Sequence, residues 1–230
     1  MVKENLAITE ERIKAVCERA GRKPGSVTLI AVSKTKPVRL IEEAYEFGIR
    51  EFGENKAQEM KEKYDMLPKN ISWHFIGHLQ TNKIKYVVGR ACLIHSVDSL
   101  HLAEEIEAYC EKKGLDADIL IEVNVAQEET KSGIKPEETE QLVKNIAGFS
   151  HVHIKGLMTI APFVENAENN RMIFRALKDL SVDIGRKNID NVSMNILSMG
   201  MTNDYEVAIE EGATHVRVGT AIFGERNIVL

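Results

Sequence analysis

Short apolar runs alternate with amphipathic segments along most of the chain. The clearest runs cover 27–33 and 118–125, and they are rich in the β-branched residues that suit a strand buried on both faces. Between the runs, apolar residues return at helical spacing, as Val38, Ile41 and Ala44 do. The pattern therefore predicts strands and helices in strict alternation.

This alternation extends over the whole chain. Strands are predicted over 27–33, 49–53, 72–77, 93–97, 118–125, 152–160, 194–198 and 214–218. Helices are predicted over 4–20, 38–47, 55–64, 81–88, 99–113, 136–147, 166–185 and 204–211. Pro136 suits a first helical position, and Gly148 suits the end of the same helix.

The predicted fold class is α/β. Eight strands that alternate with helices require a parallel sheet, and this number favours closure into a (β/α)8 TIM barrel. A doubly wound open sheet is the alternative, but no Gly-x-Gly-x-x-Gly follows the first predicted strand. No linker or low-complexity tract divides the chain, so a single domain over 1–230 is expected. The extra helix over 4–20 precedes the barrel and is a candidate lid or plug.

Composition narrows the classes of function. Of the 230 residues 43% are hydrophobic, enough for a large core, and the net charge is -5. Lysine and arginine are mixed with acidic residues, so neither nucleic acid nor an anionic membrane is expected as a partner.

The N-terminus lacks an apolar signal segment and no run approaches the roughly twenty residues that span a bilayer, so a cytoplasmic protein is expected. Cys17, Cys92 and Cys110 show no metal-binding spacing, and we expect reduced thiols and no metal site.

Candidate functional residues follow the predicted strands at their C-terminal ends, where barrels of this class carry their sites. Lys34 follows the first strand, and partial loss of hydration there would favour its neutral amine, a nucleophile toward an aldehyde. An ordinary solvated lysine is the alternative. Asn55 and His78 follow the second and third strands, Lys36 is a secondary amine near the mouth, and Lys131 is expected to be solvated.

Two loops near the C-terminus suit an anion. Ser198 and Gly200 end the seventh strand, and Gly219 and Thr220 follow the eighth. Small hydroxyl residues and glycines ahead of a helix expose backbone N–H groups to a phosphate. A lysine across the mouth then suggests a phosphorylated aldehyde held as a Schiff base, and pyridoxal 5′-phosphate (PLP) has this chemistry. Arg217 would face the pyridine nitrogen, keep it unprotonated and weaken the cofactor as an electron sink.

Five further segments carry a resemblance to a known family. They are Phe-Gly-Glu-Asn at 52–55, Trp-His-Phe-Ile-Gly-His-Leu-Gln-Thr-Asn-Lys at 73–83, Gly-Leu-Met at 156–158, Leu-Ser-Met-Gly-Met at 197–201 and Arg-Val-Gly-Thr at 217–220. Together with the segment around Lys34, they resemble the motifs of the pyridoxal-phosphate homeostasis protein family. Its members are single-barrel proteins similar to the N-terminal domain of alanine racemase, and the match covers nearly the whole chain.

The resemblance implies a role for each matching residue. It implies that Lys34 bears the cofactor and that Arg217 lies at the ring nitrogen. The phosphate would be held by Ser198, Gly200, Gly219 and Thr220, and the pocket would be lined by Asn55, His78 and Met199. The family is understood as non-catalytic regulators of vitamin B6 and amino-acid balance, so no residue is assigned a catalytic role. The tail over 225–230 departs from the family pattern by ending in apolar residues.

Two classes of function are weighed against each other. The first is a PLP carrier and regulator that holds the cofactor and passes it to PLP-dependent apo-enzymes. The second is a PLP-dependent amino-acid racemase or decarboxylase, which would need a second acid/base from an additional domain. The chain ends just after the eighth predicted strand, so we expect a monomeric carrier rather than an enzyme. A barrel that binds a phosphorylated sugar or amine without an imine would leave Lys34 unexplained.

Overall fold

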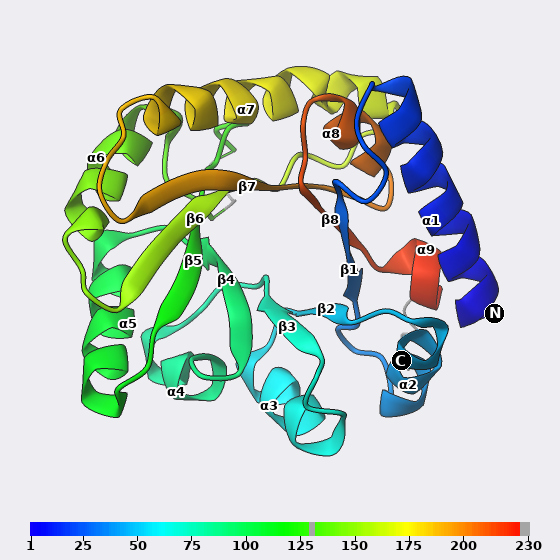
Figure 1. Ribbon diagram of the computed structural model, residues 1–230, viewed down its shortest axis with the longest axis horizontal. Coiled ribbons are helices and arrows are strands. Elements are labelled where there is room, and N and C mark those ends of the chain that lie inside the picture. The colour runs from blue at the N-terminus through cyan, green and yellow to red at the C-terminus, as the bar shows by residue number, and fades with distance from the viewer. Residues whose placement is uncertain (129–131, 226–230) are drawn as a thin grey trace.

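Eight parallel strands form the centre of the molecule. The computed structural model describes residues 1–128 and 132–225, so the expectations for Lys131 and for the tail beyond residue 225 lie outside the described residues. The strands are β1 (Thr28–Val32), β2 (Glu51–Glu54), β3 (Ser72–Phe75), β4 (Ala91–Val97), β5 (Ala117–Glu122), β6 (Val152–Met158), β7 (Val192–Met201) and β8 (His215–Val218). They pair in chain order, and β8 pairs with β1, so the sheet closes into a barrel (Figure 1). The predicted α/β barrel is confirmed.

Helices surround the barrel on its outer face (Figure 1). They are α1 (Val2–Arg19), α2 (Val38–Phe47), α3 (Ala57–Met66), α4 (Ile84–Val87), α5 (Leu100–Lys113), α6 (Pro136–Ala147), α7 (Arg171–Gly185), α8 (Tyr205–Glu210) and α9 (Thr220–Phe223), with short 3-10 helices over Thr81–Lys83 and Ala167–Asn170. Each predicted helix has a counterpart, although 81–88 divides into a 3-10 turn and the single turn α4. No helix in the described part of the chain combines the length and apolarity that crossing a bilayer requires.

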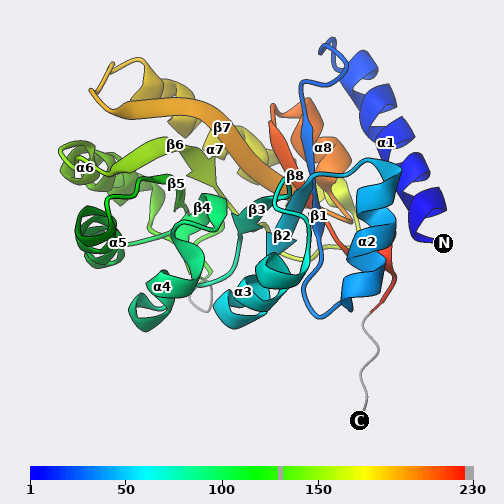
Figure 2. The same cartoon turned by 60° about the horizontal axis from the view of Figure 1, so that its bottom comes forward.

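The N-terminal helix is neither a lid nor a plug. It belongs to the outer layer, where it packs against α2, α8 and α9 and lies beside α2 at one edge of the molecule (Figure 2). Leu6, Val16 and Cys17 are buried in this contact, and the Asn5 side chain donates a hydrogen bond to the carbonyl of Ile222 at 2.9 Å. The expectation failed because an apolar stripe shows that a helix is buried but not which surface covers it.

The core has two parts. Most apolar side chains, including Phe52, Trp73 and Phe174, form one continuous cluster with the surrounding helices. Inside the barrel, Leu93, Leu120 and Met158 form a separate small cluster. Polar side chains share this interior: His95 on β4 and Ser198 on β7 do not lie on neighbouring strands, so the hydrogen bond between them crosses the barrel.

Gly156 allows β6 and β7 to lie close together, and this gives the first testable prediction. Its φ is +154°, and a Cβ atom there would lie 1.8 Å from the carbonyl oxygen of Ile196 on β7. We expect Gly156→Ala to lower the free energy of unfolding by about 3 kcal/mol, because the two strands must separate. Gly148→Ala is the matched control, since Gly148 has nothing within 4 Å and should stay within about 0.5 kcal/mol of the parent. Urea denaturation measures both, and equal stability of the two variants would contradict this packing.

Candidate functional site

A cavity of about 490 Å³ opens at the C-terminal ends of the strands. Its walls come from the segments that follow β1, β2, β3, β6, β7 and β8. The residues used below are Val32, Lys34, Asn55, Ile76, Ile160, Met201, Thr202, Asp204, Arg217, Gly219 and Thr220. An apolar wall with a few polar groups aimed inward is typical of a site for a small organic ligand.

Lys34 lines this cavity, two residues beyond the end of β1. Lys34 is half-buried, and hydrogen bonds to neighbouring residues hold the turn that carries it. The buried ammonium of Lys63 on α3 donates to the carbonyl of Ser33 at 2.8 Å and to the carboxylates of Glu54 at 2.6 Å and Glu59 at 2.7 Å. The Ser33 hydroxyl donates to Glu54 at 2.7 Å. The residue immediately before Lys34 therefore has little freedom to move.

The residue after Lys34 is held as well. Thr35 adopts a left-handed φ of 62°, and its backbone N–H donates to Glu59 at 2.6 Å. Such a conformation is uncommon for a residue other than glycine and needs support from its surroundings. Burial raises the pKa of Glu54, the carboxylate at the centre of the network, and the nearby Lys63 opposes that rise. The network thus fixes the direction in which Lys34 leaves the strand.

Lys36 has a different role from Lys34. Its ammonium donates to the carbonyls of Phe223 at 3.1 Å, Gly224 at 2.8 Å and Glu225 at 2.7 Å. It therefore ties the loop after β1 to the end of α9. Lys36 is not among the residues that line the cavity, whereas Lys34 is.

Arg217 on β8 forms the floor of the cavity and is almost completely buried. Its Nη1 donates to the Ser198 hydroxyl at 2.6 Å, and its Nη2 donates to the carbonyl of Thr159 at 2.9 Å. Burial lowers the pKa of Arg217 to about 10, and the carboxylates of Glu122 and Asp204 oppose that fall. The guanidinium is thus a fixed set of N–H donors beneath the cavity.

A chain of hydrogen bonds continues from Arg217 through the barrel. Ser198 lies 2.9 Å from His95 Nδ1, His95 Nε2 lies 2.9 Å from His74 Nδ1, and His74 Nε2 lies 2.7 Å from Glu51. Arginine can only donate, so the Ser198 hydroxyl accepts from it and donates onward to His95. The same reasoning puts the proton of each histidine on Nε2, with the carboxylate of Glu51 as final acceptor. Burial, with His74 and Arg217 nearby, holds the pKa of His95 well below its usual value, so His95 is neutral.

The residues predicted to hold the phosphate divide into two groups. Ser198 does not line the cavity, because its hydroxyl belongs to the chain below Arg217. Gly200 packs against α8, where a Cβ atom would lie 2.6 Å from that of Ala208. The strand continues to Met201 and its register against β8 shifts after Ser198, so the cavity wall begins later than predicted and includes Thr202. Gly219 and Thr220 do line the cavity.

Two further predicted residues also lie away from the cavity wall. His78 is exposed to solvent beyond the end of β3, and Met199 is fully buried in the main core. Ile76 and Met201 line the cavity instead. Counting positions along the strand could not distinguish Met199 from Met201, because the local shift in register exchanges the faces of the strand.

Asn55 and Asp204 complete the polar part of the wall. Asn55 Oδ1 is buried and finds no hydrogen-bond partner within the described residues, so a donor on a ligand would satisfy it. Asp204 precedes α8, and its carboxylate accepts from the Met201 N–H at 2.7 Å and from the Asn170 side chain at 2.8 Å. It therefore shapes the loop that carries Met201 and Thr202.

Comparison with known proteins places this geometry in context. The sequence pattern of the family described as alanine racemase, N-terminal domain, matches residues 5–227. The pyridoxal phosphate homeostasis protein of Aquifex aeolicus is 48% identical over 224 residues, which cover 97% of each chain. The protein of that name from Escherichia coli K12 is 36% identical over 98% of this chain and 97% of its own.

Solved structures agree with the sequence relatives. PipY of Synechococcus elongatus, solved with PLP bound, is 33% identical and superposes with a TM-score of 0.83 over 97% of this chain and 100% of its own. An unknown protein from Bifidobacterium adolescentis reaches a TM-score of 0.93 at 36% identity, over 96% of this chain and 94% of its own. Alanine racemase of Clostridium difficile shares the fold at 14% identity, with a TM-score of 0.76 over 97% of this chain and 57% of its own.

Glu122 at the end of β5 leads us to predict how the stability of the protein depends on pH. Burial, reinforced by Asp98 and opposed by Arg217, raises the pKa of Glu122 from 4.5 to about 7. The folded protein therefore binds this proton more tightly than the unfolded chain, so stability should fall as the pH rises from about 4.5 to about 7. We expect Glu122→Gln to match the parent at pH 4 and to exceed its free energy of unfolding by about 3 kcal/mol at pH 8.

The control for this prediction is Glu137→Gln, an exposed carboxyl in the first turn of α6. It should keep the pH dependence of the parent protein. Thermal or urea denaturation at both pH values measures the difference, and a Glu122→Gln variant with the parent's pH profile would show that Glu122 is not the group responsible.

Proposed function

Because this chain belongs to the pyridoxal phosphate homeostasis protein family, we propose that it binds PLP in the cavity above Arg217 and holds it without turning over a substrate. The observation that carries the proposal is the placement of Lys34 and Arg217 in the wall of one cavity. One is an amine that can bond to an aldehyde, and the other is a fixed donor that suits a ring nitrogen. A relative with this fold, PipY, has been solved with PLP bound.

The donor groups of the cavity fit the functional groups of PLP. Lys34 is the amine for a Schiff base with the aldehyde. Thr202, Gly219 and Thr220 lie together in the wall and suit the phosphate, because hydroxyls and a glycine backbone can surround an anion. The unpartnered Oδ1 of Asn55 suits a donor elsewhere on the ligand. The cavity volume of about 490 Å³ also suits PLP, since it is in the range of pockets for small organic ligands.

Arg217 favours retention of the cofactor over catalysis. PLP supplies an electrophilic aldehyde and a pyridine ring that accepts electrons best when its nitrogen is protonated. Arg217 has no acceptor atom and cannot pass a proton to that nitrogen while it remains charged. Its position is fixed by Ser198 and Thr159, so it can donate to the nitrogen without rearrangement. This arrangement suits a protein that stores the cofactor.

The rest of the cavity wall supports a non-catalytic role. Among the described lining residues, the ionisable side chains are Lys34, Asp204, Arg217 and Glu225. Asp204 is committed to Met201 and Asn170, and Glu225 is exposed. A racemase or decarboxylase needs a further group placed to donate or accept a proton, and the described residues of this wall include no histidine, cysteine or tyrosine for that task. A carrier therefore fits better than the alternative enzyme.

The proposal extends to the setting in which the carrier acts. We propose a monomeric cytoplasmic protein that gives PLP to apo-enzymes that depend on it. The support is its mixed surface charge, which attracts neither nucleic acid nor an anionic membrane, and a binding cavity contained within one chain.

The test of the binding mode compares two lysines. We expect the parent protein to take up PLP, to become yellow and to lose that colour on treatment with borohydride, with the added mass on the peptide containing Lys34. Lys34→Ala should abolish the covalent product. Lys56→Ala is the matched control, because Lys56 is an exposed lysine directly after Asn55 and should behave as the parent. Labelling of another lysine, or a protein that takes up no PLP, would exclude the proposed binding mode.

The position of the phosphate is tested separately. Thr202→Val and Thr220→Val keep the side-chain shape but remove a hydroxyl, and each should weaken PLP retention by about 1 to 3 kcal/mol. Thr81→Val, at an exposed position of a 3-10 helix, should leave retention unchanged. Equilibrium dialysis of the reversible complex measures the difference. If both cavity variants retain PLP like the parent, the phosphate lies elsewhere.

A further inference from the structure

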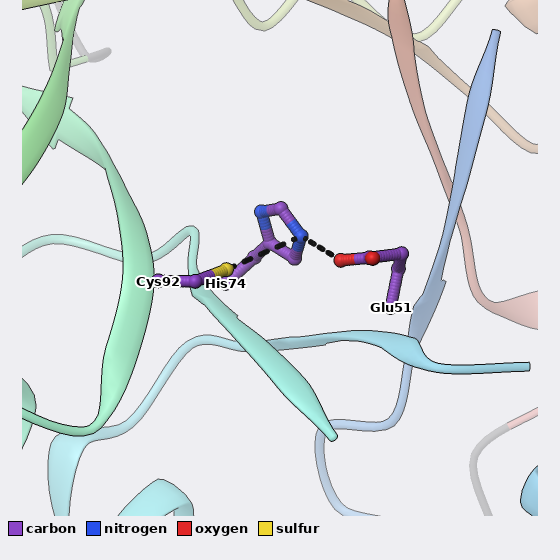
Figure 3. A group of neighbouring side chains, drawn as sticks. All are labelled: Glu51, His74 and Cys92. Atoms are coloured by element: carbon purple, nitrogen blue, oxygen red, sulfur yellow. Dashed lines mark hydrogen bonds and ion pairs between the residues drawn. The ribbon is translucent and has the colours of Figure 1, made fainter. Parts of the chain in front are cut away.

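Glu51, His74 and Cys92 meet at the end of the barrel opposite to the cavity (Figure 3). Glu51 is the first residue of β2, His74 lies on β3 and Cys92 is the second residue of β4. His74 Nε2 lies 2.7 Å from a carboxylate oxygen of Glu51 and 3.7 Å from the sulfur of Cys92. All three potential ligand atoms lie within 4.8 Å of one another.

We propose that these three side chains form a binding site for a divalent transition metal of the zinc class. Cysteine, histidine and a carboxylate are the ligands that zinc prefers, and three protein ligands leave a fourth position for water. No role at this end of the barrel follows from PLP binding, so the metal site does not depend on the proposed function.

The separation of the histidine and the thiol is close to what zinc requires. Bond lengths of about 2.0 Å to nitrogen and 2.3 Å to sulfur place these two atoms roughly 3.5 Å apart around a tetrahedral ion. The observed separation of 3.7 Å between His74 Nε2 and Cys92 Sγ needs almost no change. The Glu51 oxygen must move away from the nitrogen by roughly 0.6 Å to reach a tetrahedral edge. Glu51 can do so because its side chain is 34% exposed.

Charge and proton balance also suit a divalent ion. A thiolate from Cys92 and a carboxylate from Glu51 together neutralise the two positive charges, and His74 contributes a neutral ring. Binding breaks the S–H bond of Cys92 and releases that proton to solvent. The single ring proton of His74 moves from Nε2 to Nδ1 by exchange with water, which frees Nε2 for the metal. No oxidant or reductant is needed.

His95 contacts the ring nitrogen of His74 that faces away from the proposed metal. A metal-bound histidine usually donates its other ring N–H to an acceptor, which fixes the orientation of the ring. His74 Nδ1 lies 2.9 Å from His95 Nε2 and can make such a bond once its proton is on Nδ1. His95 then carries its own proton on Nδ1 and donates to the Ser198 hydroxyl, 2.9 Å away. A metal at this end therefore reverses the direction of the hydrogen-bond chain that leads to Arg217.

Solvent access is compatible with loading of the site. Cys92 is exposed, whereas Cys17 and Cys110 are buried. The surface group of His151, His153 and Asp116 offers a useful contrast, because two histidines lie within 3.1 and 3.9 Å of one carboxylate but no thiol is part of that group. It provides a control histidine of similar chemistry on the same chain.

The test uses the full chain, freed of metal by dialysis against a chelator, and titrates it with Co²⁺ and with Zn²⁺ in competition with a chromophoric chelator. We expect one equivalent of metal per chain and a sulfur-to-cobalt charge-transfer band. Cys92→Ser should abolish the band and weaken Zn²⁺ binding at least tenfold, and Glu51→Gln should weaken it by about 10- to 100-fold. His151→Ala should bind as the parent does, and Lys34→Ala should also bind, since it removes only the amine proposed for PLP.

Three outcomes would overturn the proposal. The first is the absence of a charge-transfer band in the parent protein. The second is equal Zn²⁺ affinity for the parent and Cys92→Ser, which would place any bound metal elsewhere. The third is loss of binding in His151→Ala rather than in Glu51→Gln, which would assign the metal to the surface group. Circular dichroism of each variant establishes that folding is unchanged.

Discussion

The burial of one arginine governs the interior of this barrel. Arg217 is 4% exposed, and a guanidinium taken out of water is costly unless its N–H groups and its charge find partners. Ser198 and the Thr159 carbonyl supply hydrogen bonds, and Glu122 and Asp204 supply negative charge nearby. The interior therefore cannot be filled with aliphatic side chains alone, although Leu93, Leu120 and Met158 form a small apolar cluster there.

Partners for Arg217 require partners of their own, which explains why polar groups reach the opposite end of the barrel. The Ser198 hydroxyl needs an acceptor, and His95 provides it; His95 in turn needs His74, and His74 needs Glu51. Each donor is satisfied only because the next residue accepts, and the series ends where a carboxylate reaches water. The two ends of the barrel are thereby joined through hydrogen bonds.

The sequence predicted the barrel well because strand and helix periodicities are local signals. It also placed Lys34, Asn55, Arg217, Gly219 and Thr220 near the cavity, since strand ends in a parallel barrel meet at one rim. It misplaced Ser198, Gly200 and Met199 relative to the cavity because the shift in register near the end of β7 cannot be read from spacing. The Lys63 network and the cluster of Glu51, His74 and Cys92 were missed, because they join side chains from separate elements and carry no motif.

The rigidity of the Lys34 turn and the burial of Arg217 favour the same kind of function. A turn held by Lys63 and Glu59 fixes the backbone that carries Lys34, so little backbone order remains to be gained there when a ligand binds. A fixed arginine at the cavity floor adds binding without supplying a proton to the ligand. Both features strengthen holding of the ligand, whereas only interactions that are stronger in the transition state lower a barrier to reaction. A site built in this way is suited to retaining a reactive aldehyde and withholding it from other amines.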